Sequence, residues 1–436
     1  MKIRDFLDLD FPLLFSAVIL TVFGILFIYS SGITSGGVSV SNEYVRQIIW
    51  AVLGFILAMV LAMSNYSRIY HISIYLYLAS IFLLVLTLFA GTVVNGARAW
   101  LRVGSFGIQP SEFAKITTIL YLSYYLDSSK RNTDDFKRFV YSCVICILPM
   151  GLVLLQPDFG TSLVWLPILI VITFVAGIPI RYVIFVSLCI TCTGTLLVMP
   201  FWQSMILKNS SRFLSLLSDI RFIAAVSAMF TLIFIIALWG FLRYKKRHFY
   251  WIDYVAFLVT LSAVLSFLGR KVLKDYQIMR LIVFLDPNVD PRGSGWNIIQ
   301  SITAIGSGGF WGKGFLRGTQ SHYRFLPQQS TDFIFSIFSE EWGLVGGILV
   351  FVLFLTICLR LIKIMKTTQD TFGSYITAGF AAVYVFHFLI NVGMTMGIMP
   401  ITGIPLLFMS YGGSALVSSM TGIGLALSVH IRRFQY

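Results

Sequence analysis

The sequence has 436 residues, of which 58% are hydrophobic and only 11% are charged, and its formal net charge is +14. A soluble domain of this length carries roughly a quarter charged residues, so the composition excludes a soluble globular protein. The apolar runs are long enough for helices and lack the alternation of barrel strands, which predicts an all-α polytopic membrane protein.

We expect one integral membrane domain over residues 1–436, with about twelve spans. Short segments on one side of these spans hold most of the Lys and Arg, as in the run 243–247. Because cytoplasmic loops are enriched in these residues, we expect both termini in the cytoplasm and no nucleic-acid partner. The expected spans begin near Pro12, Ile48, Ile72, Ile108, Phe139, Ser162, Tyr182, Ile220, Ile252, Phe333, Ser374 and Leu406.

The cysteines include two Cys-x-x-Cys pairs, Cys143 with Cys146 and Cys189 with Cys192, whose spacing alone suggests a zinc site. Both pairs lie in apolar spans without nearby charges to stabilise thiolates, so we expect buried apolar thiols. The histidines are scattered and lack metal-ligand spacing.

The loop after the third expected span, residues 91–107, is compact and basic and carries Arg98 and Arg102. It leads into the sequence QPSEFAKI, in which Glu112 and Lys115 stand three residues apart on one helical face. The topology puts this loop on the outer side, so we expect it to contribute to a site at the outer surface.

Three further segments are expected at the same surface. The motif QPDFGTS places Asp158 there, and a Gly-, Pro- and Ser-rich segment, 391–419, joins the last two spans. The longest loop, about residues 269–331, is rich in glycine, basic and aromatic residues, so we expect it to be folded and functional. Its basic residues include Arg280, Lys313 and Arg324.

A polar loop becomes an apolar span within FLPQQSTDFIFSIFSEEW, residues 325–342, with Asp332 at the junction and Glu340 and Glu341 beyond it. An ionisable group at a membrane is costly and is therefore a functional candidate. A carboxylate beside Arg and Lys suits deprotonation of a hydroxyl and departure of an anionic group, so Asp332 is the expected general base. The expected ligands of phosphate oxygens are Arg98, Arg102, Arg280, Lys313 and Arg324.

Simpler structural roles are open for each carboxylate. Asp332 could cap the helix that it opens, and Glu112 could form a buried structural pair with Lys115. Asp158 could end a helix without any other role. Glu340 could pair with Lys115 across the bundle or cap a re-entrant bend.

Several blocks occur in a fixed order: GARAWLRVGSFGIQPSEFAK, LQPDFGTSL, YQIMRLIVFLDPNVDP, GTQSHYRFLPQQSTDFIF and MPITGIPLLFMSYGGSAL. Over nearly its whole length the chain resembles the SEDS family (shape, elongation, division and sporulation), most closely its RodA branch. The resemblance implies a peptidoglycan glycosyltransferase that polymerises lipid II at the outer face of the bacterial cytoplasmic (inner) membrane for cell elongation and shape. It also implies a class B penicillin-binding protein, a transpeptidase, as partner, and a divalent cation, Mg²⁺ or Mn²⁺, without a nucleotide.

The resemblance also assigns roles to particular residues. The family's essential carboxylate falls on Asp332, and its Glu and Lys of QPSE-x-x-K fall on Glu112 and Lys115. The Asp of its QPD motif falls on Asp158, and the Arg after YQ falls on Arg280. The ligands of a cation are not assigned.

The chain departs from the family pattern in two places. The family usually has FLPE-x-HTDF, whereas Gln328 and Ser330 stand here in place of the Glu and the His. An acid and a histidine are thereby lost within four residues of the expected base. The family also usually has ten spans, and about residues 203–269 add a helix pair joined by RYKKRHFYW, whose role the sequence does not give.

In the expected mechanism, Asp332 removes the proton from the 4-hydroxyl of an acceptor GlcNAc. That oxygen attacks C1 of a donor MurNAc with inversion, giving a β-1,4 link as undecaprenyl pyrophosphate leaves. Two alternative hypotheses are a flippase for lipid II and a non-catalytic scaffold for a penicillin-binding protein. Flipping predicts polar residues through the membrane depth, whereas the ionisable groups here crowd toward the outer face, which favours the enzyme.

Overall fold

The computed structural model describes residues 8–34, 36–94, 96–103, 106–130, 133–205, 219–272 and 275–434. The chain divides into two compact units, one made of residues 1–178 with 297–436 and the other of residues 179–296. Nearly all of the described secondary structure is helical, which confirms the prediction of an all-α membrane protein.

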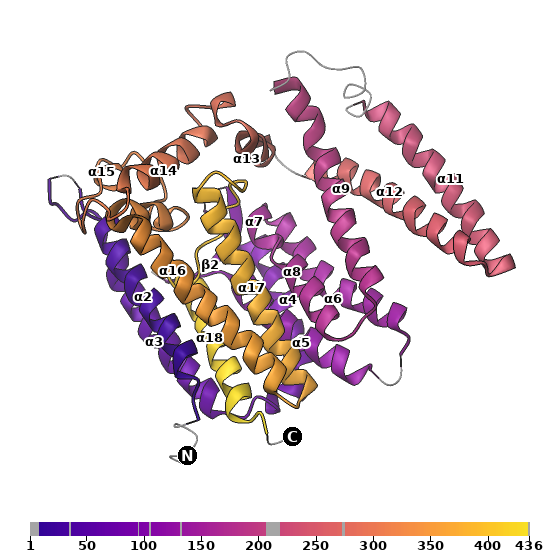
Figure 1. Cartoon of the computed structure of the whole chain (residues 1–436), viewed down its shortest axis with the longest axis horizontal. Coiled ribbons are helices and arrows are strands. Elements are labelled where there is room, and N and C mark those ends of the chain that lie inside the picture. Colours follow the sequence, from indigo (N-terminus) through magenta and orange to yellow (C-terminus); the bar gives the residue numbers. More distant parts are fainter. Residues whose placement is uncertain are drawn as a thin grey trace. The chain divides into compact units, whose positions relative to one another are not determined.

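The first unit is a helical bundle in which α16, α17 and α18 contact one another (Figure 1). Helix α3 packs on α18, α2 packs on α16, and α5 contacts both α4 and α17. The helices are α2 (Phe11–Ser31), α3 (Glu43–Met63), α4 (Arg68–Ala90), α5 (Pro110–Ser128), α6 (Asp135–Leu155), α7 (Phe159–Ser162), α8 (Trp165–Val175), α15 (Thr319–His322), α16 (Ile334–Thr367), α17 (Thr371–Thr395) and α18 (Gly413–Ile431). Helix α14 (Ser294–Gly308) crosses the boundary of the two units and belongs to this one from Asn297 onward.

The basic loop after α4 forms a small antiparallel sheet of order β1-β2-β3. Its strands are β1 (Thr92–Val94), β2 (Ala97–Val103) and β3 (Phe106–Ile108). Pro110 begins α5 directly after the sheet, at a helix position where the missing N–H of proline costs no hydrogen bond.

In the second unit, the described residues form three long helices and two short ones. Helix α12 packs against both α11 and α9, so the three lie side by side (Figure 1). Their bounds are α9 (Ile180–Met205), α11 (Ile220–Tyr244) and α12 (Arg247–Val272), followed by α13 (Asp275–Leu285) and the 3-10 helix η1 (Pro287–Val289). Helices α11 and α12 fall in the region predicted as an inserted pair, and their status as an insertion stays a prediction.

Among the described residues, ten helices are long and apolar enough to cross a membrane: α2, α3, α4, α6, α9, α11, α12, α16, α17 and α18. Helix α5 and the shorter apolar segment 159–175 occupy two more of the predicted spans but are not among the ten. The chain is therefore a multi-pass membrane protein, and the count of twelve spans stays a prediction.

The last span begins later than predicted. The sequence pattern placed its start near Leu406, but α18 begins at Gly413 and residues 401–412 form an irregular loop. Gly403 has a φ of 73° and Phe408 a φ of 68°, and Pro405 lies between them. Helical geometry is incompatible with left-handed residues, so apolar composition alone misplaced this boundary.

Candidate active site

Asp332 lies in a tight turn immediately before α16. Gln328 begins this turn with a φ of 51°, and its carbonyl oxygen accepts hydrogen bonds from the backbone N–H groups of Thr331, Asp332 and Phe333, at 3.3, 3.2 and 3.4 Å. The N-cap position of α16 is occupied by Phe333, so Asp332 does not occupy it. Asp332 is half-buried and belongs to the loop rather than to the membrane-spanning helix.

The loop of residues 401–412 holds this turn from a distant part of the chain. The Ser410 hydroxyl donates to the Thr331 carbonyl at 2.5 Å, and the Tyr411 N–H donates to the Ser330 carbonyl at 2.8 Å. Two consecutive peptide units before Asp332 are thereby fixed, and within the turn the Thr331 hydroxyl also donates to the Gln328 carbonyl at 3.2 Å.

Two buried amide side chains complete the support, and the sequence interpretation missed both. Gln47 donates to the Ser410 carbonyl at 3.1 Å and accepts from the Gly412 N–H at 3.2 Å. Asn391 on α17 donates to the Asp332 carbonyl at 2.9 Å. Both are fully buried within apolar helices. Gln47 lies at the start of the second expected span, and Asn391 begins the segment that joins the last two spans. A polar side chain at the edge of an apolar run was the signal that could have found them.

The QPSE and QPD motifs meet beside the same loop. The Gln109 amide donates to the Asp158 carboxylate at 3.0 Å, and the Gln109 N–H donates to the Ser414 hydroxyl at 3.0 Å. A side chain on Gly160 would come within 2.1 Å of the Thr402 carbonyl oxygen, so only glycine permits this approach to the 401–412 loop. The QPSE and QPD motifs therefore contact each other and the segment 402–414, which in turn holds the Asp332 turn.

Asp158 has a structural role in this arrangement. It is the N-cap of α7, where its carboxylate accepts from the Thr161 N–H at 3.2 Å. Burial raises the pKa of Asp158, and the Thr161 hydrogen bonds oppose that shift. Asp158 thus begins α7 and also accepts from Gln109, which differs from the alternative in which it ends a helix without any other role.

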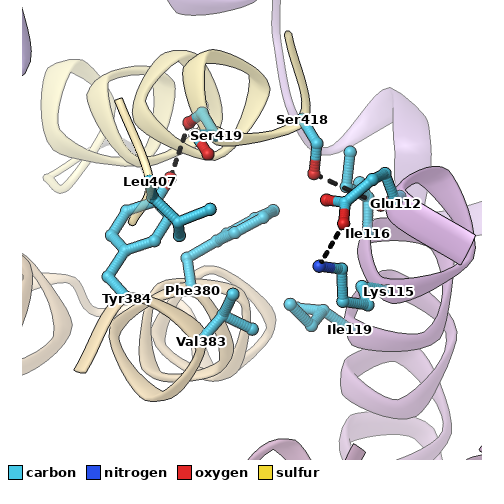
Figure 2. A pocket seen from close by; sticks show the side chains of 10 residues that line it. All are labelled: Glu112, Lys115, Ile116, Ile119, Phe380, Val383, Tyr384, Leu407, Ser418 and Ser419. Atoms are coloured by element: carbon cyan, nitrogen blue, oxygen red, sulfur yellow. Dashed lines mark hydrogen bonds and ion pairs between the residues drawn. The ribbon is translucent and has the colours of Figure 1, made fainter. Parts of the chain in front are cut away.

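Glu112 and Lys115 form an ion pair inside the bundle, with 2.8 Å between carboxylate and ammonium and side chains that are each 3% exposed. Figure 2 shows the pair beside a small cavity, about large enough for one water molecule, between α5, α17 and α18. The Ser418 hydroxyl donates to the Glu112 carbonyl at 3.2 Å. Lys115 also lies 3.3 Å from a ring nitrogen of His387.

Glu340 binds the glycine-rich loop instead of Lys115, so the alternative pairing across the bundle is wrong. Its carboxylate accepts from the Lys313 ammonium at 2.7 Å and from the N–H groups of Thr319 and Gln320 at 2.8 and 3.1 Å. The reason is local, because the loop containing these donors folds over the end of the first helical segment of α16. Lys313, expected to bind phosphate, is thus engaged by a fully buried carboxylate.

Glu341 extends this support. It accepts from the Leu316 N–H at 3.0 Å and from the Ser30 hydroxyl of α2. Two residues after Glu341, α16 is broken at Gly343, which has a φ of 65° and a ψ of −160°. The two glutamates therefore organise the 309–320 loop at a helix break. That Glu340 caps a re-entrant bend stays a prediction.

The other predicted basic residues lie on three different elements of the chain. Arg98 and Arg102 are exposed on β2, and a guanidinium nitrogen of Arg98 donates to the Leu88 carbonyl at 3.3 Å. Arg324 is exposed with a φ of 57°. Arg280 is half-buried on α13, which belongs to the second unit.

No group of three or more His, Cys, Asp or Glu side chains within the described ranges is arranged to hold a metal ion. These residues therefore do not fit a metal cage built from protein ligands alone. All five cysteines are free. Cys146 and Cys189 are buried as expected, whereas their partners in the two motifs, Cys143 and Cys192, are only half-buried.

The fold defines the class of the protein, that of polytopic helical membrane proteins, and the Asp332 turn with its buried polar contacts is the candidate site. The family model of the cell cycle proteins FtsW, RodA and SpoVE matches residues 11–221 and 222–435. The chain belongs to this family.

Curated relatives match along at least 95% of their length. The chain is 48% identical to the peptidoglycan glycosyltransferase RodA of Treponema pallidum, over 99% of this chain and 100% of the relative. It is 31% identical to the peptidoglycan glycosyltransferase MrdB of Escherichia coli K12, over 98% and 95% of the two chains. It is also 31% identical to the stage V sporulation protein E of Bacillus subtilis, over 96% of each.

Solved structures share the fold. A chain of a peptidoglycan synthase complex that coordinates polymerization and crosslinking superposes with a TM-score of 0.68 at 26% identity, covering 98% of this chain and 99% of that one. The rod shape determining protein RodA of Thermus thermophilus gives a TM-score of 0.60 at 24% identity, covering 98% of each.

Proposed function

We propose that this protein is a peptidoglycan glycosyltransferase that polymerises lipid II into glycan strands for cell elongation and shape. Relatives at 48% and 31% identity over nearly the full length are glycosyltransferases of this kind. The observation that carries the proposal is the rigid turn of Asp332, which is held by the 401–412 loop and α17. A fixed carboxylate outside the spanning helix is what a general base requires.

In this mechanism Asp332 takes the proton from the 4-hydroxyl of an acceptor GlcNAc while the oxygen attacks C1 of a donor MurNAc. The C1–oxygen bond to undecaprenyl pyrophosphate breaks, and the configuration at C1 inverts. One base and no covalent glycosyl-enzyme are needed. General-base catalysis contributes typically about 10²–10⁴-fold to rate, so much of the remaining acceleration comes from positioning and from neutralising the leaving group.

Exposed guanidinium groups are proposed to neutralise that leaving group. Arg98, Arg102 and Arg324 are exposed and suit bidentate contacts with phosphate oxygens, and Arg280 is kept as a fourth candidate. Lys313 is less available, since it is paired with Glu340. We further propose that a divalent cation, Mg²⁺ or Mn²⁺, binds together with the pyrophosphate oxygens, because such ions are commonly held by substrate phosphates with few protein ligands.

The proposed location is the bacterial cytoplasmic (inner) membrane, with both termini in the cytoplasm and the site on the outer face. The Asp332 turn bonds to residues 410–411, just before α18 begins at Gly413, whereas the C-terminus follows the other end of that helix. At 1.5 Å per residue, 19 residues separate the two ends by about 28 Å, close to the thickness of a bilayer core. The charge asymmetry supports the same orientation.

The proposed partner is a class B penicillin-binding protein that supplies the transpeptidase. The support is the likeness, at 26% identity, to a chain of a synthase complex that coordinates polymerization with crosslinking. Such a partner would act on the strands that this protein releases.

Neither alternative function has an observation in its favour. A flippase needs polar groups that remain available along the membrane depth, but the buried carboxylates of Glu112 and Glu340 are engaged by Lys115 and Lys313. A scaffold needs no rigid carboxylate turn.

The discriminating experiment supplies purified lipid II, with Mg²⁺ or Mn²⁺, to the protein in detergent. It is run alone and with a partner whose transpeptidase serine has been inactivated, and glycan strands are separated by length. The proposal expects glycan strands to form in reactions that contain this protein as the only polymerase. Lipid II crossing a vesicle membrane without any strand formation would contradict the proposal and favour the flippase.

A further inference from the structure

Asn391 sits on α17 between two backbone carbonyl oxygens from different parts of the chain. Its amide nitrogen donates to the Asp332 carbonyl at 2.9 Å and to the Ile404 carbonyl at 2.8 Å. Carbonyl oxygens only accept hydrogen bonds, so the nitrogen rather than the oxygen of the amide must face them. The side chain is fully buried, which strengthens both contacts and makes them costly to lose.

His387 lies four residues earlier and therefore on the same face of α17. Its Nδ1 is 3.0 Å from the Pro405 carbonyl, and its Nε2 is 3.3 Å from the Lys115 ammonium. Because the carbonyl can only accept, Nδ1 carries the proton, and Nε2 is then left to accept from Lys115. This neutral tautomer links the Glu112–Lys115 pair to the backbone next to Ile404.

Asn391 and His387 thus contact the consecutive carbonyls of Ile404 and Pro405. Asn391 also donates to the carbonyl of Asp332 itself. We propose that Asn391 is a positioning residue for Asp332, with His387 tying the same backbone to the buried ion pair. This inference rests on the proposed function, in which Asp332 is the base. Fixing the carbonyl fixes the orientation of the Cα–Cβ bond, and a displacement of about 1 Å can cost about 10²-fold in rate.

A purely structural role would predict lower thermal stability and nothing specific to Asp332. A positioning role predicts that kcat falls while KM for lipid II stays nearly constant, because the substrate contacts remain. It also predicts that the backbone amides of residues 328–333 lose protection in substrate-free protein, since the turn loses its anchor.

The test uses Asn391→Leu, which keeps the approximate shape and removes both hydrogen bonds, and Asn391→Asp, which turns an acceptor toward two carbonyls. The matched control is Thr377→Val, a buried residue of α17 whose hydroxyl donates to Gly373 of the same helix. Full-length variants are purified in detergent, and kcat, KM and hydrogen–deuterium exchange of residues 328–333 are measured. Asn391→Ser is included as a smaller replacement should either larger change prevent folding.

We expect kcat of the Asn391 variants to fall at least tenfold, with KM within twofold and faster exchange at 328–333, while Thr377→Val behaves like wild type. Added to Asp332→Asn, Asn391→Leu should cause no further loss, because the two act through one group. Wild-type kcat and exchange in folded Asn391 variants, with Asp332→Asn inactive, would overturn the positioning role and leave the base assignment intact. An active Asp332→Asn protein would overturn both.

Discussion

At the scale of single residues, the Glu112–Lys115 pair shows how strongly a buried charge depends on its partner. Both side chains are almost fully removed from solvent, and they lie 2.8 Å apart. Removing one partner of a buried pair typically costs about 3–5 kcal/mol, because the other charge is left uncompensated, whereas removing both can be nearly neutral.

We therefore expect Glu112→Gln and Lys115→Met each to lower the thermal midpoint in detergent strongly, and the double variant to be more stable than either single one. A double-mutant cycle of thermal unfolding gives the coupling directly. Strictly additive losses would show that the two charges do not stabilise one another.

Asp158 leads to a prediction about pH. Burial raises the pKa of Asp158 in the folded protein, so folding favours the protonated carboxyl. The stability that this protonated carboxyl contributes is fully present below the ordinary pKa of aspartate. That contribution is lost as the pH rises from about 4, the ordinary pKa of aspartate, through the raised pKa of the folded state. Asp158→Asn mimics the protonated form, and Gln109 can rotate its amide to present an acceptor.

The thermal midpoint of Asp158→Asn relative to wild type should accordingly increase as the pH is raised from about 4 to 8. Thermal unfolding in detergent at several pH values measures the difference. A relative midpoint that falls as the pH rises would mean that the ionised carboxylate stabilises the fold.

The candidate site was only partly predictable at this scale. Asp332 stood out because it is a carboxylate at the border of an apolar span. Asn391 and Ser410 did not, because they act on backbone carbonyls that are 59 and 79 positions away in sequence. Lys313 was predicted to bind phosphate oxygens, because the sequence of a glycine-rich loop does not reveal that the loop folds back and pairs Lys313 with Glu340.

At the scale of elements, the break in α16 connects the membrane helix with the loop. Gly343 has a left-handed φ of 65°, and a Cβ on it would lie 2.4 Å from the backbone nitrogen of Gly312. The Leu344 N–H donates across the break to the Gly309 carbonyl at 3.0 Å. Helix α16 and the 309–320 loop are therefore held together by contacts between their backbones.

Gly343→Ala should destabilise this junction, because the new methyl group meets backbone that cannot move aside and the φ is unfavourable. We expect a lower thermal midpoint and faster proteolysis within residues 309–320. Gly151→Ala is the matched control, since Gly151 lies in helix α6 with open space around its missing side chain, and this change should be neutral or slightly stabilising. Equal behaviour of the two variants would contradict the account of the break.

Sequence patterns identified the helices better than their ends. Apolar length was sufficient for α16 and α17, but it placed the start of α18 near Leu406, within a loop with two left-handed residues. That irregular loop contributes Ser410 and Tyr411 to the Asp332 turn. The misplaced boundary therefore concealed a part of the site.

At the scale of the whole molecule, composition alone was sufficient for the class of protein, because 58% hydrophobic residues can be accommodated only with the bilayer as solvent. The number of spans was less accessible, since α5 is interrupted by polar and charged side chains such as Glu112 and Lys115 that are buried against other helices. Function followed from the order of several motifs and from the family to which the chain belongs.

The central claim is that Asp332 is the base of a lipid II polymerase. The most direct measurement compares glycan strand formation by wild type, Asp332→Asn and Asp135→Asn, each purified in detergent with its partner and shown to have the same thermal midpoint. Asp135 is a suitable control because it is a half-exposed aspartate paired with Arg138. We predict a loss of at least about 10²-fold for Asp332→Asn, as general-base catalysis typically contributes that much, and full activity for Asp135→Asn. Wild-type strand formation by Asp332→Asn would contradict the claim.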